Sequence, residues 1–393
     1  MQLKQSRTIR IVLVLFGALT MSLAARIGVG SLSGIALGVY LGGPGTLLWI
    51  WTTSFLCATM AFAESVLAVV YRRKDEGHIY RGGPFYYISD GLGKKHLALI
   101  YAFVILFAYI GGFLSMQVNT VTKCFTSVMS INPLFIGLTI AIVAGLTIFG
   151  GVKKIAGVTS KLVPIITVFY LSICLYIIIS NYKMVPQILV NIIDSAFNYK
   201  AFGFGILSTL LIGMQKGIFS SELGLGTGSI AAATTDTKTA AESGLVQTFG
   251  IHIENLLFAT ITTFAICMSD YASIVIGDPN GIELTLHAFK YHIGNIGPIF
   301  ITITITLFAL STVLAGYYYG ESSLKFIKKA KPIDIIILKI LTLIVIIISS
   351  IISSNLLWTI VDIMVGVIAV INVYALFALR KTVVEEYKYY KSD

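Results

Sequence analysis

The residues best suited to chemistry in this sequence lie beside two glycine-rich stretches that interrupt apolar runs. Arg26 stands two positions before GVGSLSG at 28–34, and Glu222 stands inside SSELGLGTGS at 220–229. Glycine lets a helix unwind and lets a ligand approach the main chain closely. The N–H groups freed at such a break attract anions, and the freed carbonyl groups attract cations. The two stretches therefore indicate a binding site for a ligand that carries both charges, as an amino-acid zwitterion does.

Further charged residues fall within apolar runs that are long enough to span a membrane. Each such charge costs roughly 2.5–3.5 kcal/mol near a helix centre on insertion scales, so each needs a partner or a wet cavity. We expect the acids among them to accept hydrogen bonds from N–H groups at the helix breaks, with proton relay as the alternative. Asp362 is expected to brace helix packing. The full set is Arg26, Glu64, Lys216, Glu222, Glu254, Glu321 and Asp362.

Composition predicts a membrane protein with many spans along its whole length. Of its 393 residues, 56% are hydrophobic and 12% are charged, against about 25% charged in soluble domains. Its mean hydropathy is +0.90, and apolar blocks of about 20 residues, enough to cross a bilayer, recur along it. We predict an all-α integral membrane protein, a single domain over 1–393 with ten transmembrane helices. The predicted spans are 10–40, 44–71, 96–124, 133–150, 157–180, 203–234, 245–268, 295–328, 333–351 and 354–378.

The positive charges predict the orientation of these spans. The net charge is +10, which in a soluble protein would suggest nucleic acid or an anionic surface as a partner. Here most of the 28 Lys and Arg residues fall in segments on one side of the predicted spans, as the positive-inside rule requires. We therefore expect a multi-pass protein in a lipid bilayer with cytoplasmic N- and C-termini, and no nucleic-acid partner.

The two glycine-rich breaks are half a chain apart. Gly28 leads the first and Gly224 leads the second, and four further predicted spans follow each. Five spans followed by five make the second half enter the membrane from the opposite side, which is the pattern of an inverted repeat with broken first helices. We predict repeat one at about 10–180, repeat two at about 203–378 and a polar, frayed tail at 380–393. A single such cluster would instead indicate close packing through small residues.

Motifs for catalysis and metal binding are weak. HIE at 252–254 matches part of a zinc-deaminase signature, but no P-C-x-x-C follows it. The four cysteines are isolated in or at the ends of apolar spans, and the five histidines form no H-E-x-x-H grouping. We therefore expect no catalytic residues and no cofactor. A secondary transporter is the favoured class, and a membrane enzyme or a substrate sensor that does not transport are the alternatives.

Several ordered motifs make the chain similar to one family of transporters. They are GGPGT at 42–46, RGGPFYYISDGLG at 81–93, GGVKKIAGVTSKLVP at 150–164, KGIFSSELGLGTGSIAAA at 216–233, SGLVQTFGIHIE at 243–254 and STVLAGYYYGE at 311–321. With them the chain resembles the sodium:alanine symporter family (alanine or glycine:cation symporters) of the amino acid–polyamine–organocation superfamily. The resemblance implies a five-plus-five inverted-repeat fold with broken helices 1 and 6, and amino acid transport across the cytoplasmic (inner) membrane.

The resemblance also implies a substrate site at the two breaks. The family's first broken helix usually reads GTGN, which falls on residues 28–31, and its backbone is expected to hold the substrate carboxylate. The FSNEAGMGS motif falls on residues 219–227, and a glutamine of the third core helix falls on Gln117. The substrate-binding residues so implied are Gly28, Gly30, Ser31, Gln117, Phe219, Ser220, Gly224, Gly226 and Thr227.

A cation site is implied between helix 1 and helix 8. In this fold, carbonyls of helix 1 and a pair of hydroxyl groups hold sodium, which is the implied coupling ion. Ser311 and Thr312 match that pair, and hydroxyl oxygens suit a hard cation.

The family has a small neutral residue where this chain has Arg26, which stays protonated when buried. Our hypothesis is that its guanidinium partly occupies the cation site and bonds Glu64 or Glu222. The alternatives are a structural pair elsewhere or an arginine that faces the cytoplasmic vestibule. The residues of this site or its substitute are Ala25, Arg26, Ser311 and Thr312.

Other departures from the family bear on the substrate and the coupling ion. Val29 and Ser31 replace a threonine and an asparagine, Gly316 stands where a tryptophan is common, and the usual extra N-terminal span is not expected. We predict cation-coupled symport of small neutral amino acids, of the alanine or glycine type, by alternating access. The alternatives are a sodium-independent exchanger or a proton-coupled permease in which Arg26 stands in for the cation. No oligomeric state is predicted.

Overall fold

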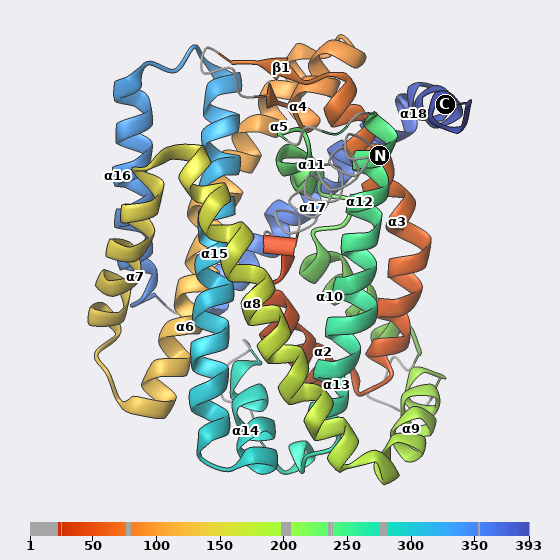
Figure 1. Ribbon diagram of the computed structural model, residues 1–393, viewed down its shortest axis with the longest axis vertical. Coiled ribbons are helices and arrows are strands. Elements are labelled where there is room, and N and C mark those ends of the chain that lie inside the picture. The colour runs from red at the N-terminus through yellow and green to blue at the C-terminus, as the bar shows by residue number, and fades with distance from the viewer. Residues whose placement is uncertain are drawn as a thin grey trace, which may run out of the picture.

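The computed structural model describes residues 23–24, 26–75, 80–197, 206–234, 237, 239–274, 281–352 and 354–392. This part of the chain is helical apart from one short hairpin (Figure 1). Its first half holds η1 (Gly30–Gly34), α2 (Ile35–Gly42), α3 (Thr46–Val70), β1 (Arg73–Lys74), β2 (Tyr80–Arg81), α4 (Pro84–Tyr86), η2 (Tyr87–Gly91), α5 (Lys95–Phe107), η3 (Ala108–Phe113), α6 (Leu114–Met129), α7 (Pro133–Ile148), α8 (Gly151–Ser180), η4 (Tyr182–Met184) and α9 (Val185–Phe197). Its second half holds α10 (Ile206–Ser221), α11 (Thr227–Ala232), α12 (Ala240–His252), η5 (Ile253–Phe258), α13 (Ala259–Cys267), η6 (Tyr271–Ser273), α14 (Ile282–Ile293), α15 (Ile296–Ile327), α16 (Pro332–Ser349), α17 (Ser354–Ala378) and α18 (Arg380–Ser392).

The helices match the predicted membrane spans. In the described residues, seven helices are long and apolar enough to cross a membrane: Thr46–Val70, Lys95–Met129, Gly151–Ser180, Ala240–Cys267, Ile296–Ile327, Pro332–Ser349 and Thr359–Ala378. Two shorter apolar helices, Gly30–Gly42 and Pro133–Ile148, and the interrupted pair α10–α11 lie where the other three spans are predicted. The all-helical membrane architecture predicted from composition is therefore confirmed, and the count of ten spans is compatible with it.

The first glycine-rich stretch bends its helix. Residues 23–24 and 26 are helical, the chain bends at Ile27 and Gly28, and helical structure resumes at Val29. Residues Gly30–Gly34 then form η1, a π-helical segment that leads into α2. Such segments are rare, and they occur frequently at functional sites. We refer to residues 23–42 as helix 1.

The second glycine-rich stretch interrupts its helix completely. Helix α10 ends at Ser221 and α11 begins at Thr227. Between them, Glu222, Gly224 and Gly226 have φ angles of +53°, +77° and +74°. Glycine tolerates this left-handed backbone, whereas a glutamate adopts it only when its surroundings hold it there. The side-chain partners of Glu222 are therefore part of the structure of this break.

Two groups of helices pack against each other around helix 1. Helix α3 packs along α10 and α12, while α15 packs against α5, α6 and α8, and α7 pairs with α16. Figure 1 shows α3 and α12 at one side of the molecule, α7 and α16 at the other, and α15 with α8 between them. We call helix 1, α3, α10–α11 and α12–α13 the bundle, and we call α5–α8, α15 and α16 the scaffold.

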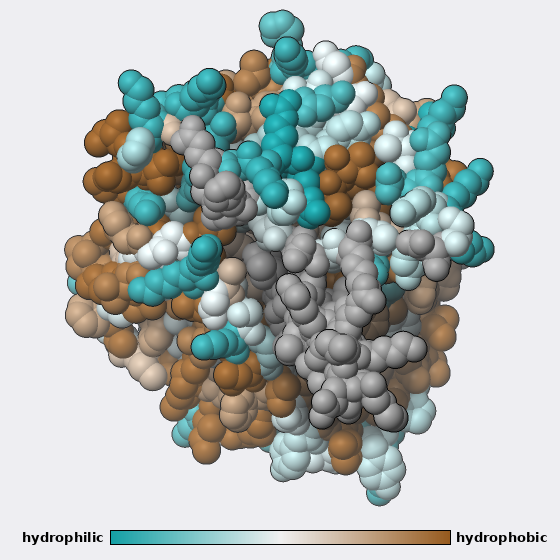
Figure 2. Space-filling view, turned by 45° about the horizontal axis from the view of Figure 1, so that its top comes forward, coloured by the Kyte–Doolittle hydropathy of each residue, from teal (hydrophilic) through white to brown (hydrophobic). Residues whose placement is uncertain are grey.

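The surface separates apolar flanks from a charged end. Large apolar side chains are exposed on the flanks, among them Phe55, Leu56, Phe135, Leu146 and Val370. Figure 2 shows hydrophilic residues gathered toward the end that is uppermost in Figure 1, and hydrophobic residues over much of the remainder of that view. Exposed apolar flanks of this kind are what lipid requires of a membrane protein.

The connectors between spans carry structure of their own. The two longer connectors, 181–202 and 269–294, contain the short helices α9 and α14. Thr285 of α14 donates a hydrogen bond to the Leu32 carbonyl (3.1 Å), so α14 covers η1. The prediction of a frayed tail is wrong, because residues Arg380–Ser392 form the helix α18. Its contacts with α3 and α12 explain the difference, since packing against a larger surface stabilises a short polar helix.

An ion network joins the connector after α3 to α15. Arg81 donates hydrogen bonds to Asp75 (2.7 Å) and Glu321 (2.9 Å), and Tyr317 donates one to the other oxygen of Glu321 (3.0 Å). Burial alone would lower the pKa of Arg81, but the facing Tyr318 and the two carboxylates raise it above its ordinary value. Glu321, predicted as a charge at one end of its span, is thus paired.

Candidate substrate and cation sites

The bend of helix 1 is contacted by one side chain from α6 and one from α15. The Val29 N–H donates a hydrogen bond to Gln117 Oε1 (3.1 Å). A Cβ atom at Gly28 would lie 2.6 Å from Thr312 Oγ1 and 3.2 Å from Gln117 Oε1. Only glycine therefore permits this approach, and the main chain of helix 1 is open to polar groups at this point.

Helix 1 also meets the end of α10 closely. A Cβ atom at Gly30 would lie 3.1 Å from the Ser220 Cα and 3.5 Å from the Phe219 ring. The Phe219 ring stacks on Phe113 at 5.6 Å, and Phe113 stacks on Tyr109 at 4.6 Å. These rings form an aromatic wall beside the glycines, which is suited to excluding water from a small ligand.

Ser31 links the bend of helix 1 to a buried carboxylate. Its hydroxyl accepts a hydrogen bond from the Gly28 N–H (3.4 Å) and donates one to Glu254 Oε1 (2.5 Å). Glu254 lies in η5, a π-helical segment between α12 and α13, and its side chain is completely buried. The substituted serine of the first motif therefore contacts one of the predicted membrane acids.

Asn255 is a polar residue of this region that the motif comparison did not single out. Ser220 donates to its Oδ1 (3.2 Å), and its Nδ2 donates to Ser221 (3.2 Å). The residue is fully buried. The sequence did contain a signal for Asn255: it follows Glu254 directly within an apolar span, and adjacent buried polar groups need hydrogen-bond partners.

The hydroxyl pair on α15 meets carbonyls of helix 1. Ser311 donates hydrogen bonds to the carbonyls of Ala24 (3.2 Å) and Phe308 (2.7 Å). Thr312 donates to the carbonyls of Ile27 (3.5 Å) and Phe308 (3.1 Å). Two hydroxyl and three carbonyl oxygens thus converge from two helices, and such neutral oxygens are ligands for a hard cation.

Arg26 contacts helices other than α15. Its Nη1 donates a hydrogen bond to the Gln247 carbonyl of α12 (3.2 Å), and its Nη2 lies 2.6 Å from where a Cβ atom at Gly228 of α11 would be. The side chain is 4% exposed. Ala25, its predicted neighbour in the cation site, lies outside the described residues. The acids that attract its charge are Glu222, Glu64 and Glu254.

Glu222 holds the second break together through both of its carboxylate oxygens. Tyr109 donates a hydrogen bond to Oε1 (2.9 Å), and Thr227 donates one to Oε2 (2.9 Å). Two hydroxyl donors on one buried carboxylate compensate for much of its lost hydration. Thr227, predicted to bind substrate, is therefore engaged with an acid in the structure.

Glu64 of α3 braces the same break from the other side. Its Oε1 accepts hydrogen bonds from the Gly226 N–H (3.1 Å) and from Asn372 of α17 (2.7 Å). Asn372 also donates to the Gly224 carbonyl (2.9 Å) and accepts from Tyr87. Gly224 and Gly226 thus contact Glu64 and α17, whereas Gly28, Gly30, Ser31, Gln117, Phe219 and Ser220 lie together.

Asp362 and Lys216 face each other across α17 and α10. Asp362 is half-buried, Lys216 is 5% exposed, and their opposite charges attract each other. The Cγ atom of Lys216 lies 3.2 Å from where a Cβ atom at Gly38 of α2 would be. The position of Asp362 fits the packing role that the sequence predicts for it.

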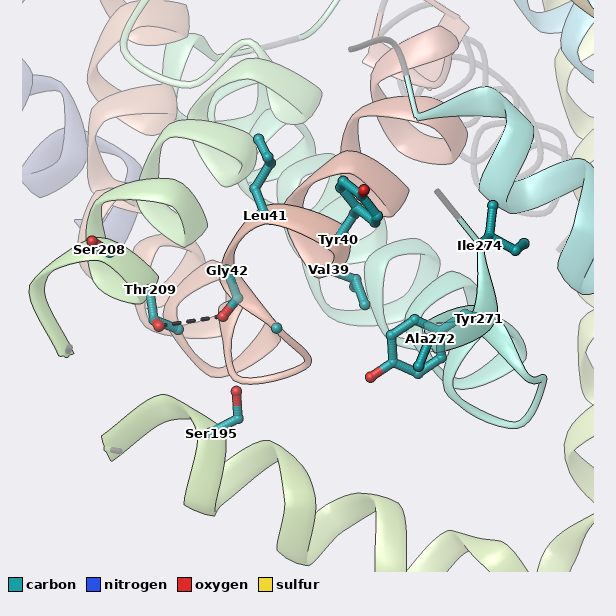
Figure 3. Close-up of a pocket in the computed structure, with 11 residues that line it drawn as sticks. Val39, Tyr40, Leu41, Gly42, Ser195, Ser208, Thr209, Tyr271, Ala272 and Ile274 are labelled. Atoms are coloured by element: carbon teal, nitrogen blue, oxygen red, sulfur yellow. Dashed lines mark hydrogen bonds between the residues drawn. The ribbon is translucent and has the colours of Figure 1, made fainter. Parts of the chain in front are cut away.

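A separate cavity lies at the far end of α2 from the bend of helix 1. It has a volume of about 300 Å³ and opens between α2, α9, α10 and η6 (Figure 3). Thr209 donates a hydrogen bond to the Gly42 carbonyl at its edge (3.3 Å). It is lined by Val39, Tyr40, Leu41, Gly42, Gly43, Ser195, Ser208, Thr209, Tyr271, Ala272 and Ile274. None of these eleven residues belongs to the predicted substrate or cation site.

The fold and the broken helices define the class: a membrane transporter of the inverted-repeat type, with which a five-plus-five arrangement of spans is compatible. The structure resembles that of MhsT in complex with L-phenylalanine, with a TM-score of 0.63 at 12% identity over 91% of this chain and 87% of that one. It also resembles a Na⁺-coupled sialic acid symporter, with a TM-score of 0.53 at 14% identity over 94% and 87%. Likeness at these identities establishes the fold.

The chain belongs to the sodium:alanine symporter family, whose model matches residues 3–393. It is 35% identical over 376 residues to the probable sodium/glutamine symporter GlnT of Bacillus subtilis, covering 95% of this chain and 78% of that one. It is 34% identical over 380 residues to the sodium/alanine symporter AgcS of Methanococcus maripaludis, covering 95% and 83%. The amino-acid carrier protein AlsT of B. subtilis is 33% identical over 374 residues, covering 95% and 79%. The predicted family is therefore confirmed, and the chain is a membrane transporter rather than an enzyme.

Proposed function

We propose that this chain is a sodium-coupled symporter of small neutral amino acids, of the alanine or glycine type. The observation that carries the proposal is the convergence of the Ser311 and Thr312 hydroxyls on the Ala24 and Ile27 carbonyls. These oxygens lie directly beside the bend at Gly28, where the main chain is open to a ligand. The relatives named as sodium/alanine and sodium/glutamine symporters support the choice of ion.

The substrate site proposed is the pocket between helix 1, α6 and the end of α10. The substrate carboxylate would bind N–H groups of residues 28–30, close to Gln117, and the ammonium group would face carbonyls at the end of α10. The Phe219 ring beside Gly30 limits the size of the side chain that fits. A Cβ atom at Gly316, where the family commonly has tryptophan, would lie 2.7 Å from Leu114, so this side is also filled.

Sodium binding would couple the two groups of helices. Its ligands come from helix 1 in the bundle and from α15 in the scaffold, so a bound ion holds the two together. Alternating access then corresponds to rocking of the bundle against the scaffold around the bend of helix 1. We place repeat one at about 10–180 and repeat two at about 203–378, in the inner membrane with both termini in the cytoplasm.

Reconstitution tests this function directly. Purified protein in liposomes is assayed for uptake of labelled alanine, glycine, serine and glutamine under an inward sodium gradient, a proton gradient or neither. We expect the sodium gradient to drive accumulation of alanine or glycine, with glutamine transported less well. Uptake that needs no sodium but does need an amino acid inside the liposome would overturn symport. It would instead support exchange with Arg26 in place of the ion.

A further inference from the structure

Three buried acids of the bundle differ in how their charge is compensated. Glu222 accepts hydrogen bonds on both oxygens, and Glu64 accepts two on Oε1. Glu254 accepts one, from Ser31 on Oε1, and its Oε2 has no partner among the described residues although the side chain is 0% exposed. A buried carboxylate oxygen without a donor is costly when ionised, but a protonated carboxyl needs fewer donors.

The charges around Glu254 also disfavour its ionised form relative to those of Glu222 and Glu64. Arg26, on helix 1, is the positive charge that faces it, and Arg26 is also shared with Glu222 and Glu64. From α8 the facing titratable group is Tyr170, whose hydroxyl bonds Thr262 (2.8 Å) and adds no positive charge. One guanidinium therefore serves three carboxylates, of which Glu254 has the fewest donors.

We propose that Glu254 binds a transported proton together with the amino acid substrate, in addition to the cation at Ser311 and Thr312. The proposal rests on the substrate site proposed above. The Gly28 N–H donates to the Ser31 hydroxyl, and that hydroxyl donates to Glu254, so a two-step chain of hydrogen bonds links the bend to the carboxylate. A substrate carboxylate at the bend competes for the same donors and is repelled by an ionised Glu254.

The coupling follows from this competition. Protonation of Glu254 on Oε2 removes the negative charge and frees the Ser31 hydroxyl to turn toward the substrate. Linkage is reciprocal, so a bound substrate carboxylate favours protonation by the same factor, on the order of tenfold. One proton is taken up with the zwitterion on one side and released with it on the other, and no other bond changes. Both Ser31 and Glu254 lie on π-helical segments, a geometry that often marks functional sites.

The test uses full-length protein in liposomes that contain a pH-sensitive dye, with equal sodium on both sides and the membrane potential held at zero. External alanine should acidify the lumen in the parent protein. Glu254→Gln keeps an acceptor for Ser31 but cannot carry a proton; its acidification should fall at least about tenfold while alanine counterflow continues. Glu283→Gln, which removes a partly exposed carboxylate on α14, is the matched control and should behave as the parent does.

A second measurement is the pH dependence of alanine affinity, which is made first on the parent protein and then on the variant. In the parent, apparent alanine affinity should fall as the pH rises, by about tenfold in total over the titration of Glu254, and this dependence should vanish in Glu254→Gln. Alanine-driven sodium uptake without acidification in the parent, or a lower ratio of sodium to alanine transported in Glu254→Gln, would overturn the proton site and leave the proposed function intact. Absence of any amino acid transport by the parent would instead contradict the proposed function.

Discussion

The two helix breaks of this transporter differ in the chemistry of the groups that meet them. The break between α10 and α11 is surrounded by carboxylates: Glu222 bonds Tyr109 and Thr227, and Glu64 bonds Gly226. The bend of helix 1 is contacted directly by neutral groups, chiefly the Gln117 amide and the hydroxyls of α15, and its nearest bonded carboxylate, Glu254, is reached through the Ser31 hydroxyl. The two glycine-rich sequences are similar, but at the second break the polar groups of the main chain are hydrogen-bonded by the protein itself, whereas those at the bend of helix 1 remain suited to binding a ligand.

The difference also concerns which helices are joined. At the bend of helix 1, the contacts of Thr312 and Gln117 come from the scaffold. At the second break, both carboxylates, Glu222 and Glu64, belong to the bundle, and the scaffold contributes the Tyr109 hydroxyl that donates to Glu222. A ligand bound at the bend of helix 1 can therefore contact both the bundle and the scaffold, and its binding depends on how closely the two approach. At the second break, Glu64 and Glu222 fasten bundle residues to one another through Gly226 and Thr227, in addition to the Tyr109 contact with the scaffold.

The largest expected effect comes from filling the space beside helix 1. Gly30→Leu places a side chain within 3.1–3.5 Å of the Ser220 backbone and the Phe219 ring. We expect loss of substrate binding by about a hundredfold or more, because overpacking here cannot be relieved without moving a main chain. Isothermal titration with alanine on folded, monodisperse protein measures it.

Gly366→Leu is the matched control for that variant. A Cβ atom at Gly366 meets nothing within 4 Å, so this substitution on α17 should leave alanine binding unchanged. Intact binding in Gly30→Leu would show that the bend of helix 1 is not the substrate site and that the comparison between the breaks is mistaken.

The next largest effect concerns the cation. Thr312→Val keeps the shape of the side chain but removes the hydroxyl beside the Ile27 carbonyl. We expect the sodium concentration for half-maximal uptake to rise about tenfold, equivalent to about 1.4 kcal/mol of binding free energy. Thr306→Val is the control, since among the described residues that hydroxyl bonds only the Thr302 carbonyl of its own helix. An unchanged sodium dependence in Thr312→Val would place the coupling ion elsewhere.

The sequence predicted the architecture far better than the contacts of the charged residues. Apolar blocks and the two glycine clusters located the spans and both breaks, because lipid demands long helices and tolerates a break only inside the protein. The pairing of Glu64 with Gly226 and Asn372 could not be read in the same way. Glu64 lies on α3, Gly226 in the second break and Asn372 on α17, far apart in sequence, and only packing brings them together.

The acids at the second break offer a test of its structural role. Glu64→Ala removes the acceptor of the Gly226 N–H and of one N–H of the Asn372 amide, whose other bond to the Gly224 carbonyl remains. We expect a loss of stability of about 1–3 kcal/mol for each buried donor left unpaired, seen as a lower melting temperature in detergent. Alanine affinity of the remaining folded protein should change little. A large drop in affinity at unchanged stability would give the second break a direct role in substrate binding.

The smallest effect on transport is expected at Arg26. Its guanidinium bonds the Gln247 carbonyl and lies against Gly228, both within the bundle, so Arg26→Thr should lower stability while sodium dependence persists. Gly228→Ala should be destabilising by about 1–3 kcal/mol alone, because its methyl would meet the guanidinium at 2.6 Å. In the Arg26→Thr background the same alanine should cost almost nothing, and thermal melts of the four proteins give this coupling. If Arg26→Thr instead creates a steep sodium dependence that the parent lacks, the guanidinium occupies the position of the ion, and the bend of helix 1 is as fully satisfied by the protein as the second break.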